Sequence, residues 1–358
     1  MALAAALLRY AAAATGWNQS YHSGYVDSAG SWAGGSEIVH LVGHQGALFA
    51  ANGYWMDSQP PSTGLGATSQ VLRLDEPHGE WAVDLELQKG TSRTETLKEL
   101  EFHTGTGEGQ TVRVLLAADF AWTPDHMFHV NVYVRDNLSG RWNTTEIATG
   151  SVAKLKASGG SLSLRAVCVH RDRVTNAERV FILVGTLGIF TGVFDASLDG
   201  MIRWDAEPEP LPQLQTRPLA VIEAAGAVLL SSGKYIYKRN DGERPSYSKL
   251  YDMGGPSPTS GLGGIRGLTA IPNPNGQGES LLFLYCGANN QSAHGSGACM
   301  VRLDPDGQGG YVTHHEACLD NMVSEYLGGV TLHRLLVSRH DIAGIWVAFF
   351  SRCQRYRC

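Results

Sequence analysis

The sequence has no run of 18 or more apolar residues, so it offers no transmembrane helix. It also has no basic block: Lys and Arg number 28 against 34 Asp and Glu, and the formal net charge is −6. A nucleic-acid-binding surface, which gathers basic residues on one face, is therefore not indicated. Charged residues make up only 17% and hydrophobic residues 43%, so the chain can bury a sizeable core and is not globally disordered.

Several signatures of common enzyme classes are also missing. There is no CxxC pair, which argues against the usual zinc-ribbon and redox sites. There is no GxSxG nucleophile elbow and no HExxH metalloprotease motif. The glycine-rich stretches at 105–109 and 261–267 do not match the dinucleotide-binding fingerprint.

Glycine is abundant, with 43 of 358 residues, and 14 prolines accompany it. Short runs rich in Val, Ile, Tyr and Phe recur from about residue 36 onward, bounded by Gly, Asn, Asp or Pro. No segment after residue 16 keeps an apolar stripe of helical period over 12 residues. We therefore expect a single all-β domain over residues 17–358, with less than about 10% helix.

An internal repeat supports a more specific fold. The stretch Leu41–Phe49 matches Leu183–Thr191: each has an apolar strand, two glycines separated by two residues, and a second apolar strand. Units of about four short strands recur along the chain. Such a unit cannot bury both faces alone, and stacking units radially gives a β-propeller of four-stranded blades.

Each unit begins with a short apolar strand that we expect to lie nearest the propeller axis. These strands are Leu100–His103, Ala166–His170, Leu219–Glu223, Leu268–Pro272 and Val330–His333. A sixth would lie near Tyr21, so we expect five or six blades, with seven as an alternative. The first unit lacks an obvious inner strand and the last is short of strands. We therefore expect N-terminal strands to complete the final blade and close the ring.

One turn resembles a known family. Ser197-Leu-Asp-Gly-Met-Ile-Arg-Trp204 is similar to the Asp-box hairpin of sialidase-type propellers, Ser-x-Asp-x-Gly-x-x-Trp, although Gly200 comes one place early. The Asp box is a structural turn in those families. The resemblance therefore implies the propeller fold and not the sialidase activity.

The ends of the predicted inner strands suggest a site. His103, His170 and His333 fall at matching positions of three units, and Glu223 falls there in a fourth. Equivalent positions in different blades converge near the axis, and neutral imidazole is a ligand for iron, copper and zinc. We therefore expect the three histidines to bind a transition metal and Glu223 to act as the catalytic carboxylate.

Two classes of function fit this arrangement. An extracellular enzyme could use the metal to activate water or oxygen, or could use acid–base chemistry on a polysaccharide without metal. The alternative is a non-catalytic propeller that binds carbohydrate or protein, since Trp and Tyr side chains concentrate in the first 55 residues. In either case the expected partner is a carbohydrate or another small-molecule or polymer ligand.

The cysteines bear on the compartment. Cys286 and Cys299 flank a polar loop, and we expect a disulfide between them. Cys353 and Cys358 would pair with each other or with Cys318, and Cys168 would be a buried thiol. Four Asn-x-Ser/Thr sequons add weight to a secreted glycoprotein. Residues 1–16 are Ala-rich, which indicates either a signal-peptide remnant or a terminal helix.

The segment around Asp304 and Asp306 raises the alternative of a calcium site. Asp304 and Asp306 stand at alternate positions of a glycine-rich segment, as at the start of a calcium loop. The similar segment Asn273–Glu279 carries amides in place of most carboxylates. The pair of copies favours repeated hairpin turns over calcium binding.

Overall fold

The computed structural model describes residues 20–35, 37–54, 68–91, 93–103, 111–211, 218–255, 264–286 and 298–318. These residues form five four-stranded antiparallel sheets, each made of four consecutive strands. The chain is therefore an all-β, five-bladed propeller, as the strand-and-turn repeat predicts. A separate two-stranded sheet pairs β1 (Tyr25–Val26) with β2 (Trp32–Ala33).

The first sheet holds β3 (Glu37–His44), β4 (Ala47–Gly53), β5 (Gln70–Leu74) and β6 (Ala82–Glu86). The second holds β7 (Thr96–His103), β8 (Thr111–Trp122), β9 (Met127–Arg135) and β10 (Trp142–Ser151). The third holds β11 (Val167–Arg171), β12 (Glu178–Val184), β13 (Gly188–Phe194) and β14 (Ile202–Trp204). The fourth holds β15 (Pro218–Ala224), β16 (Ala227–Ser232), β17 (Tyr235–Asn240) and β18 (Ser246–Asp252). The fifth holds β19 (Gly264–Pro272), β20 (Glu279–Cys286), β21 (Ala298–Pro305) and β22 (Tyr311–Cys318).

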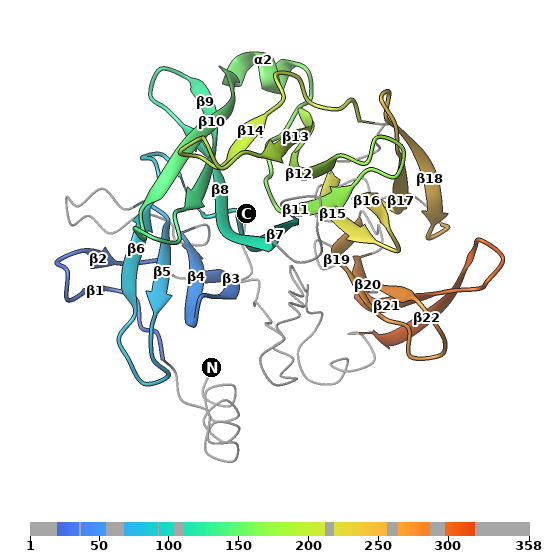
Figure 1. Cartoon of the computed structure of the whole chain (residues 1–358), viewed down its shortest axis with the longest axis horizontal. Helices are drawn as coiled ribbons and strands as arrows, with labels where there is room; N and C mark the ends of the chain where they lie inside the picture. Colours follow the sequence, from blue (N-terminus) through green and yellow to red (C-terminus); the bar gives the residue numbers. More distant parts are fainter. Residues whose placement is uncertain are drawn as a thin grey trace, which may run out of the picture.

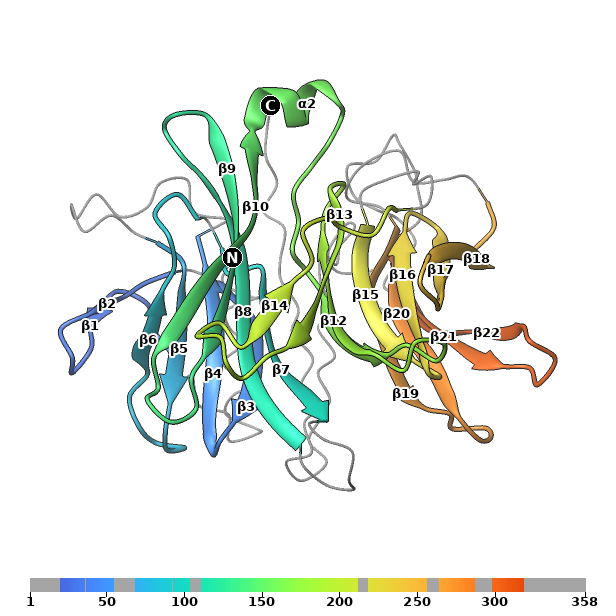
Figure 2. The same cartoon turned by 45° about the horizontal axis from the view of Figure 1, so that its top comes forward.

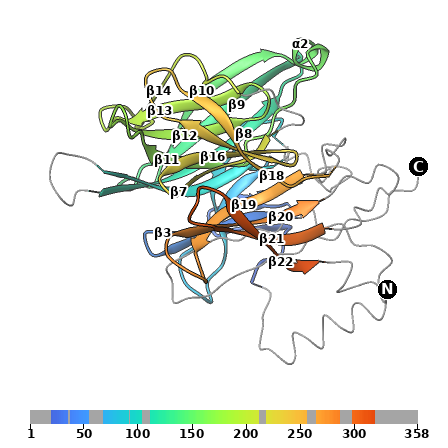
Figure 3. The same cartoon turned by 90° about the vertical axis from the view of Figure 1, so that its right-hand side faces the viewer.

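The sheets are arranged radially, with the first strand of each nearest the middle (Figure 1). Contacts between sheets run in order from β3 to β7, β11, β15 and β19. Seen with the top tilted forward, β1 and β2 stand beside the first sheet, where β2 contacts β6 (Figure 2). From the side the sheets fan out between α2 (Val152–Ala157) at one end and β22 at the other (Figure 3).

The blades are held together by apolar faces packed against each other. Strand β12 is the clearest case, because Val180, Phe181, Ile182, Leu183 and Val184 are each 0% exposed. Alternate residues of this run face opposite neighbours: Val180, Ile182 and Val184 pack on the second sheet, and Phe181 and Leu183 pack on the fourth. A strand covered on both faces needs apolar residues at every position, which explains the continuous apolar runs in the sequence.

Four of the predicted inner strands are confirmed as parts of β7, β11, β15 and β19. The fifth, Val330–His333, lies outside the described residues, as do residues 1–16. The first sheet does have an inner strand, β3, although no obvious one could be identified in the sequence beside the repeated stretch Leu41–Phe49. That stretch is the β3–β4 hairpin, whereas its repeat match joins β12 to β13. A hairpin with two glycines can join any two adjacent strands of a blade. The match between the two stretches therefore predicts a hairpin, but not which strands of the blade it joins.

The ring closure expected from N-terminal strands is not seen among the described strands. Strands β1 and β2 pair with each other, and the fifth sheet is completed by β22 from its own segment. The Asp-box-like segment forms the hairpin between β13 and β14, where the Asp195 carboxylate accepts hydrogen bonds from the Ser197 amide and hydroxyl. Within the described part of the chain, no helix has the length and apolar character needed to cross a membrane.

Candidate functional site

Two of the predicted site residues meet between the third and fourth blades. His170 lies on β11 and Glu223 on β15, and Nδ1 of His170 is 3.9 Å from Oε1 of Glu223. The imidazole is 3% exposed, whereas the Glu223 side chain is 36% exposed. Glu223 thus presents a carboxylate to solvent from an inner strand, with a buried imidazole behind it.

A second carboxylate holds the other side of the imidazole. Nε2 of His170 lies 3.2 Å from Oδ2 of Asp241, which follows β17 in the fourth blade. Asp241 also accepts hydrogen bonds from the backbone N–H of Arg173 and from the guanidinium of Arg239. The three groups form a chain, Asp241–His170–Glu223, that runs from the blade interface toward solvent.

Arg239 anchors this arrangement from within the interface. It is buried, and its guanidinium makes a two-point contact with Glu209 and single contacts with Asp172 and Asp241. Three carboxylates therefore surround one guanidinium, which leaves excess negative charge next to His170. A two-point Arg–carboxylate contact also fixes geometry, so the network holds the blades in a defined register.

The surroundings shift the pKa values of His170 and Asp241. Burial by itself would lower the pKa of His170, but hydrogen bonds and charge from Glu223 and Asp241 outweigh it, so the pKa is raised. Burial would raise the pKa of Asp241, but the Arg173 amide and His170 outweigh it, so that pKa is lowered. The hydrogen bonds and negative charge around His170 therefore favour its protonated form more than in the unfolded chain.

Lys98 and Cys168 lie close to this site. Lys98 on β7 donates a hydrogen bond of 3.0 Å to the Val167 carbonyl of β11. Its side chain reaches solvent, yet the surrounding protein removes much of its hydration and lowers the pKa of its ammonium. Burial is the main cause of the raised pKa of the Cys168 thiol; the charges of Lys98 and Arg239 lower it and that of Glu223 raises it.

His103 is placed differently from His170. Its side chain is 60% exposed, and Nδ1 lies 2.8 Å from Oε1 of Glu178 on β12. Glu178 also accepts the backbone N–H of His103, so this imidazole closes the interface of the second and third blades. His333 lies outside the described residues. Both nitrogens of His170 face carboxylates, an arrangement that suits a protonated ring better than a metal-bound one.

Other polar motifs of the sequence serve as turns and blade contacts. Asp304 binds the Arg302 guanidinium and the Ser280 hydroxyl, and Asp306 accepts the backbone N–H groups of Gln308 and Gly310. The Asp306 contacts belong to the hairpin between β21 and β22, as the turn interpretation predicts, whereas Asp304 lies on β21 and links it to β20. His44 of β3 contacts Glu99 of β7 with Nδ1 2.6 Å from Oε2.

The predicted Cys286–Cys299 disulfide is wrong, as is a link from Cys318 to Cys353 or Cys358. The disulfide joins Cys299 of β21 to Cys318 of β22, which stand directly opposite in the ladder. On its other side Cys299 is opposite Tyr285, not Cys286. Pairing in a sheet depends on register, which the loop spacing in the sequence does not give. Cys168 is a buried free thiol, as expected.

Asp241, Arg239 and Asp172 were not predicted from the sequence. A signal for Arg239 was present: it continues the Tyr235, Tyr237 alternation of β17, and an Arg on an inward face implies a buried acidic partner. Asp241 is two residues away in the same blade, but nothing in the sequence identifies Asp172 and Glu209, which come from the third blade.

Comparisons with known proteins gave structural neighbours only. No protein-family model matches the chain, and no curated protein matches it. A structural genomics protein of unknown function from Bacteroides thetaiotaomicron has 13% identity and a TM-score of 0.39, covering 80% of this chain, which spans 60% of that protein.

Two further neighbours have named activities. A GH43 β-xylosidase/α-arabinofuranosidase from a compost microbial metagenome, solved with xylotriose, has 11% identity and a TM-score of 0.37, covering 77% of this chain and 93% of that one. A Trypanosoma rangeli sialidase mutant displaying trans-sialidase activity has 11% identity and a TM-score of 0.43, covering 91% and 54%. At these identities the likeness concerns the propeller fold, and no activity follows from it.

Proposed function

We propose that this chain is an extracellular enzyme that acts on a polysaccharide by acid–base chemistry, with Glu223 as the group that exchanges a proton with substrate. The observation that carries the proposal is the chain Asp241–His170–Glu223. Its outer carboxylate reaches solvent, and its inner members are buried at a blade interface.

The chemistry follows from the charges. Glu223 as a carboxylate accepts a proton from a water molecule or a sugar hydroxyl, as a general base. When a leaving oxygen must be protonated, the imidazolium of His170 supplies a proton through Nδ1 to Glu223, which passes it on. Asp241 and the surrounding carboxylates keep His170 protonated, and the ammonium of Lys98 offers a hydrogen-bond donor to substrate oxygens nearby.

An extracellular location is part of the proposal. Disulfides persist in oxidising compartments, and Cys299 and Cys318 form one. Of the sequons, Asn143 lies on β10, the outer strand of its sheet. The Asn137 side chain is hydrogen-bonded to His44 and to the Arg113 carbonyl. We therefore expect a glycan more readily at Asn143 than at Asn137.

The test is a turnover assay on the full chain. Xylo-oligosaccharides, arabinoxylan, sialyl-oligosaccharides and uronic-acid polymers are screened for new reducing ends and for unsaturated products. Glu223→Gln should lower kcat by about 10²-fold or more, the usual contribution of a general base. Glu76→Gln, at an exposed turn, is the matched control and should leave kcat unchanged. Full activity of a folded Glu223→Gln protein would overturn the proposal.

Binding without turnover defines the alternative function. If the wild-type chain binds one of these polymers in an affinity assay but never cleaves it, the propeller is a carbohydrate-binding module. A transition metal held by His103, His170 and His333 is the other alternative. Elemental analysis of the purified protein that finds a stoichiometric metal, lost in His170→Ala and retained in Cys318→Ser, would establish it in place of the acid–base site.

A further inference from the structure

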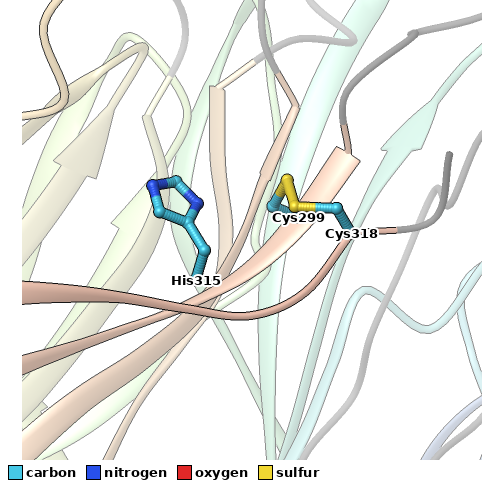
Figure 4. A group of neighbouring side chains, drawn as sticks. All are labelled: Cys299, His315 and Cys318. Atoms are coloured by element: carbon cyan, nitrogen blue, oxygen red, sulfur yellow. A yellow bond between two sulfur atoms is a disulfide. The ribbon is translucent and has the colours of Figure 1, made fainter. Parts of the chain in front are cut away.

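Three metal-ligand side chains gather at the outer edge of the fifth blade, away from the site above. Cys299 of β21 and Cys318 and His315 of β22 each offer one ligand atom, and all three atoms lie within 4.8 Å of one another. Figure 4 shows the imidazole beside the disulfide that joins the two cysteines. Among the described residues, this is the single group of three or more His, Cys, Asp or Glu side chains gathered so closely.

A β-bulge creates this gathering. His315 and Cys318 are three positions apart, and in a regular strand such residues face opposite sides of the sheet. In β22, however, His315 pairs with Val301 and Ala317 with Met300, which leaves Glu316 as an extra residue. The extra residue restores the parity, so His315 and Cys318 stand on the face of Cys299. Bulges commonly re-aim a side chain in this way.

The two neighbours of His315 on β22 make ion pairs with other residues. His314 lies with Nε2 3.1 Å from Oδ2 of Asp304, and Glu316 pairs with Arg302. Within the described residues His315 makes no hydrogen bond or ion pair, and its side chain is exposed. The imidazole of His315 therefore lies beside two sulfurs, and a metal ion can reach it from solvent.

We propose that Cys299, His315 and Cys318 form a zinc-type metal site when the disulfide is reduced, so that the disulfide and the metal are alternative clamps between β21 and β22. Two thiolates and one imidazole are a standard donor set for zinc, with a water molecule or a further ligand in the fourth tetrahedral position. Zn–S bonds are about 2.3 Å and Zn–N bonds about 2.0–2.1 Å long. Small side-chain rotations bring the two sulfurs and the imidazole nitrogen to these distances from one zinc ion.

Conversion of the disulfide form to the zinc form requires a reductant, and a dithiol supplies the electrons and protons. The dithiol gives two electrons and two protons to the Cys299–Cys318 bond, which opens to two thiols, and the dithiol closes to its own disulfide. Zinc then displaces one proton from each thiol as two Zn–S bonds form, and those two protons go to buffer. Oxidation of the thiolates by a disulfide reagent forms the Cys299–Cys318 bond again and releases the zinc.

The experiment is a zinc titration of the full chain in both redox states. Oxidised protein, and protein reduced with a dithiol and desalted without oxygen, are titrated with Zn²⁺ against a chromophoric chelator. Reduced protein should bind one zinc at this site and oxidised protein none. Cys318→Ser should remove that binding, and His315→Ala should weaken it at least about tenfold. His314→Ala is the matched control and should bind zinc as the wild type does.

Cobalt provides a readout that does not depend on counting metal. Co²⁺ added to the reduced wild type should give thiolate-to-cobalt charge-transfer absorption that is lost in Cys299→Ser and Cys318→Ser. If zinc binds equally to oxidised and reduced protein, the proposal is wrong. It is equally wrong if reduced protein binds none, or if Cys318→Ser with native circular dichroism keeps both the zinc and the cobalt absorption.

Discussion

Nε2 of His170 lies 3.2 Å from Oδ2 of Asp241, and this contact joins the third blade to the fourth at a buried position. In the same interface, the guanidinium of Arg239 binds the carboxylates of Asp172 and Glu209. The contact is therefore part of a charged layer between two apolar faces.

The raised pKa of His170 makes the stability depend on pH. The folded protein holds this proton more tightly than the unfolded chain, whose histidine titrates near about 6.5. The contribution is therefore complete below that pH and is lost as pH rises through the higher folded pKa. His170→Gln should remove this part of the pH dependence in thermal melts taken from pH 5 to 9. His129→Gln, at a surface pair with Glu146, should leave it unchanged.

Arg239 should be among the costliest polar residues to remove. Arg239→Ala leaves Asp172, Glu209 and Asp241 without their shared cation in a buried interface, at a cost of about 3 to 5 kcal/mol of unfolding free energy. Urea denaturation followed by fluorescence measures it. Arg203→Ala, whose side chain is 68% exposed, serves as the control and should unfold at the wild-type midpoint. Equal midpoints for the two variants would contradict the importance of this network.

Gly185 should tolerate no side chain. Its φ is +51°, and a Cβ there would lie 2.1 Å from the Ser161 carbonyl oxygen, which belongs to the backbone and cannot turn away. Gly185→Ala should cost about 2 to 4 kcal/mol, from left-handed strain and overpacking together. Gly30 also has a positive φ, +87°, but a Cβ there meets nothing within 4 Å. Gly30→Ala should therefore cost about 1 kcal/mol, and a loss as large as that of Gly185→Ala would refute the clash.

Cys168 should be inert in the folded protein. Burial raises the pKa of its thiol to about 12, so little thiolate exists at neutral pH. The residue is also only 3% exposed, so a reagent has little access to the sulfur. Iodoacetamide at pH 8 should leave the Cys168 peptide unmodified in native protein and modify it fully in urea. Mass spectrometry of the peptide compares the two. Similar rates in both conditions would show that the interface opens readily.

The sequence by itself determined the architecture. Short β-branched and aromatic runs bounded by Gly, Asn and Asp are local signals, so strands such as β7, β11, β15 and β19 and the hairpin turns after them could be read directly. The propeller followed because units of this size bury their faces only by stacking. Glu223 and His170 could also be named, since their place at the end of an inner strand is a local property.

Only the tertiary structure decided which side chains meet. Asp241 reaches His170 across a blade interface, while His103 turns to Glu178, and no spacing in the sequence encodes which blade face a residue contacts. The disulfide depended on the register that sets Cys299 opposite Cys318. The bulge at Glu316 then brought His315 to the same face. A shift of one residue in a strand reverses every side chain, so such pairings are properties of the assembled sheet.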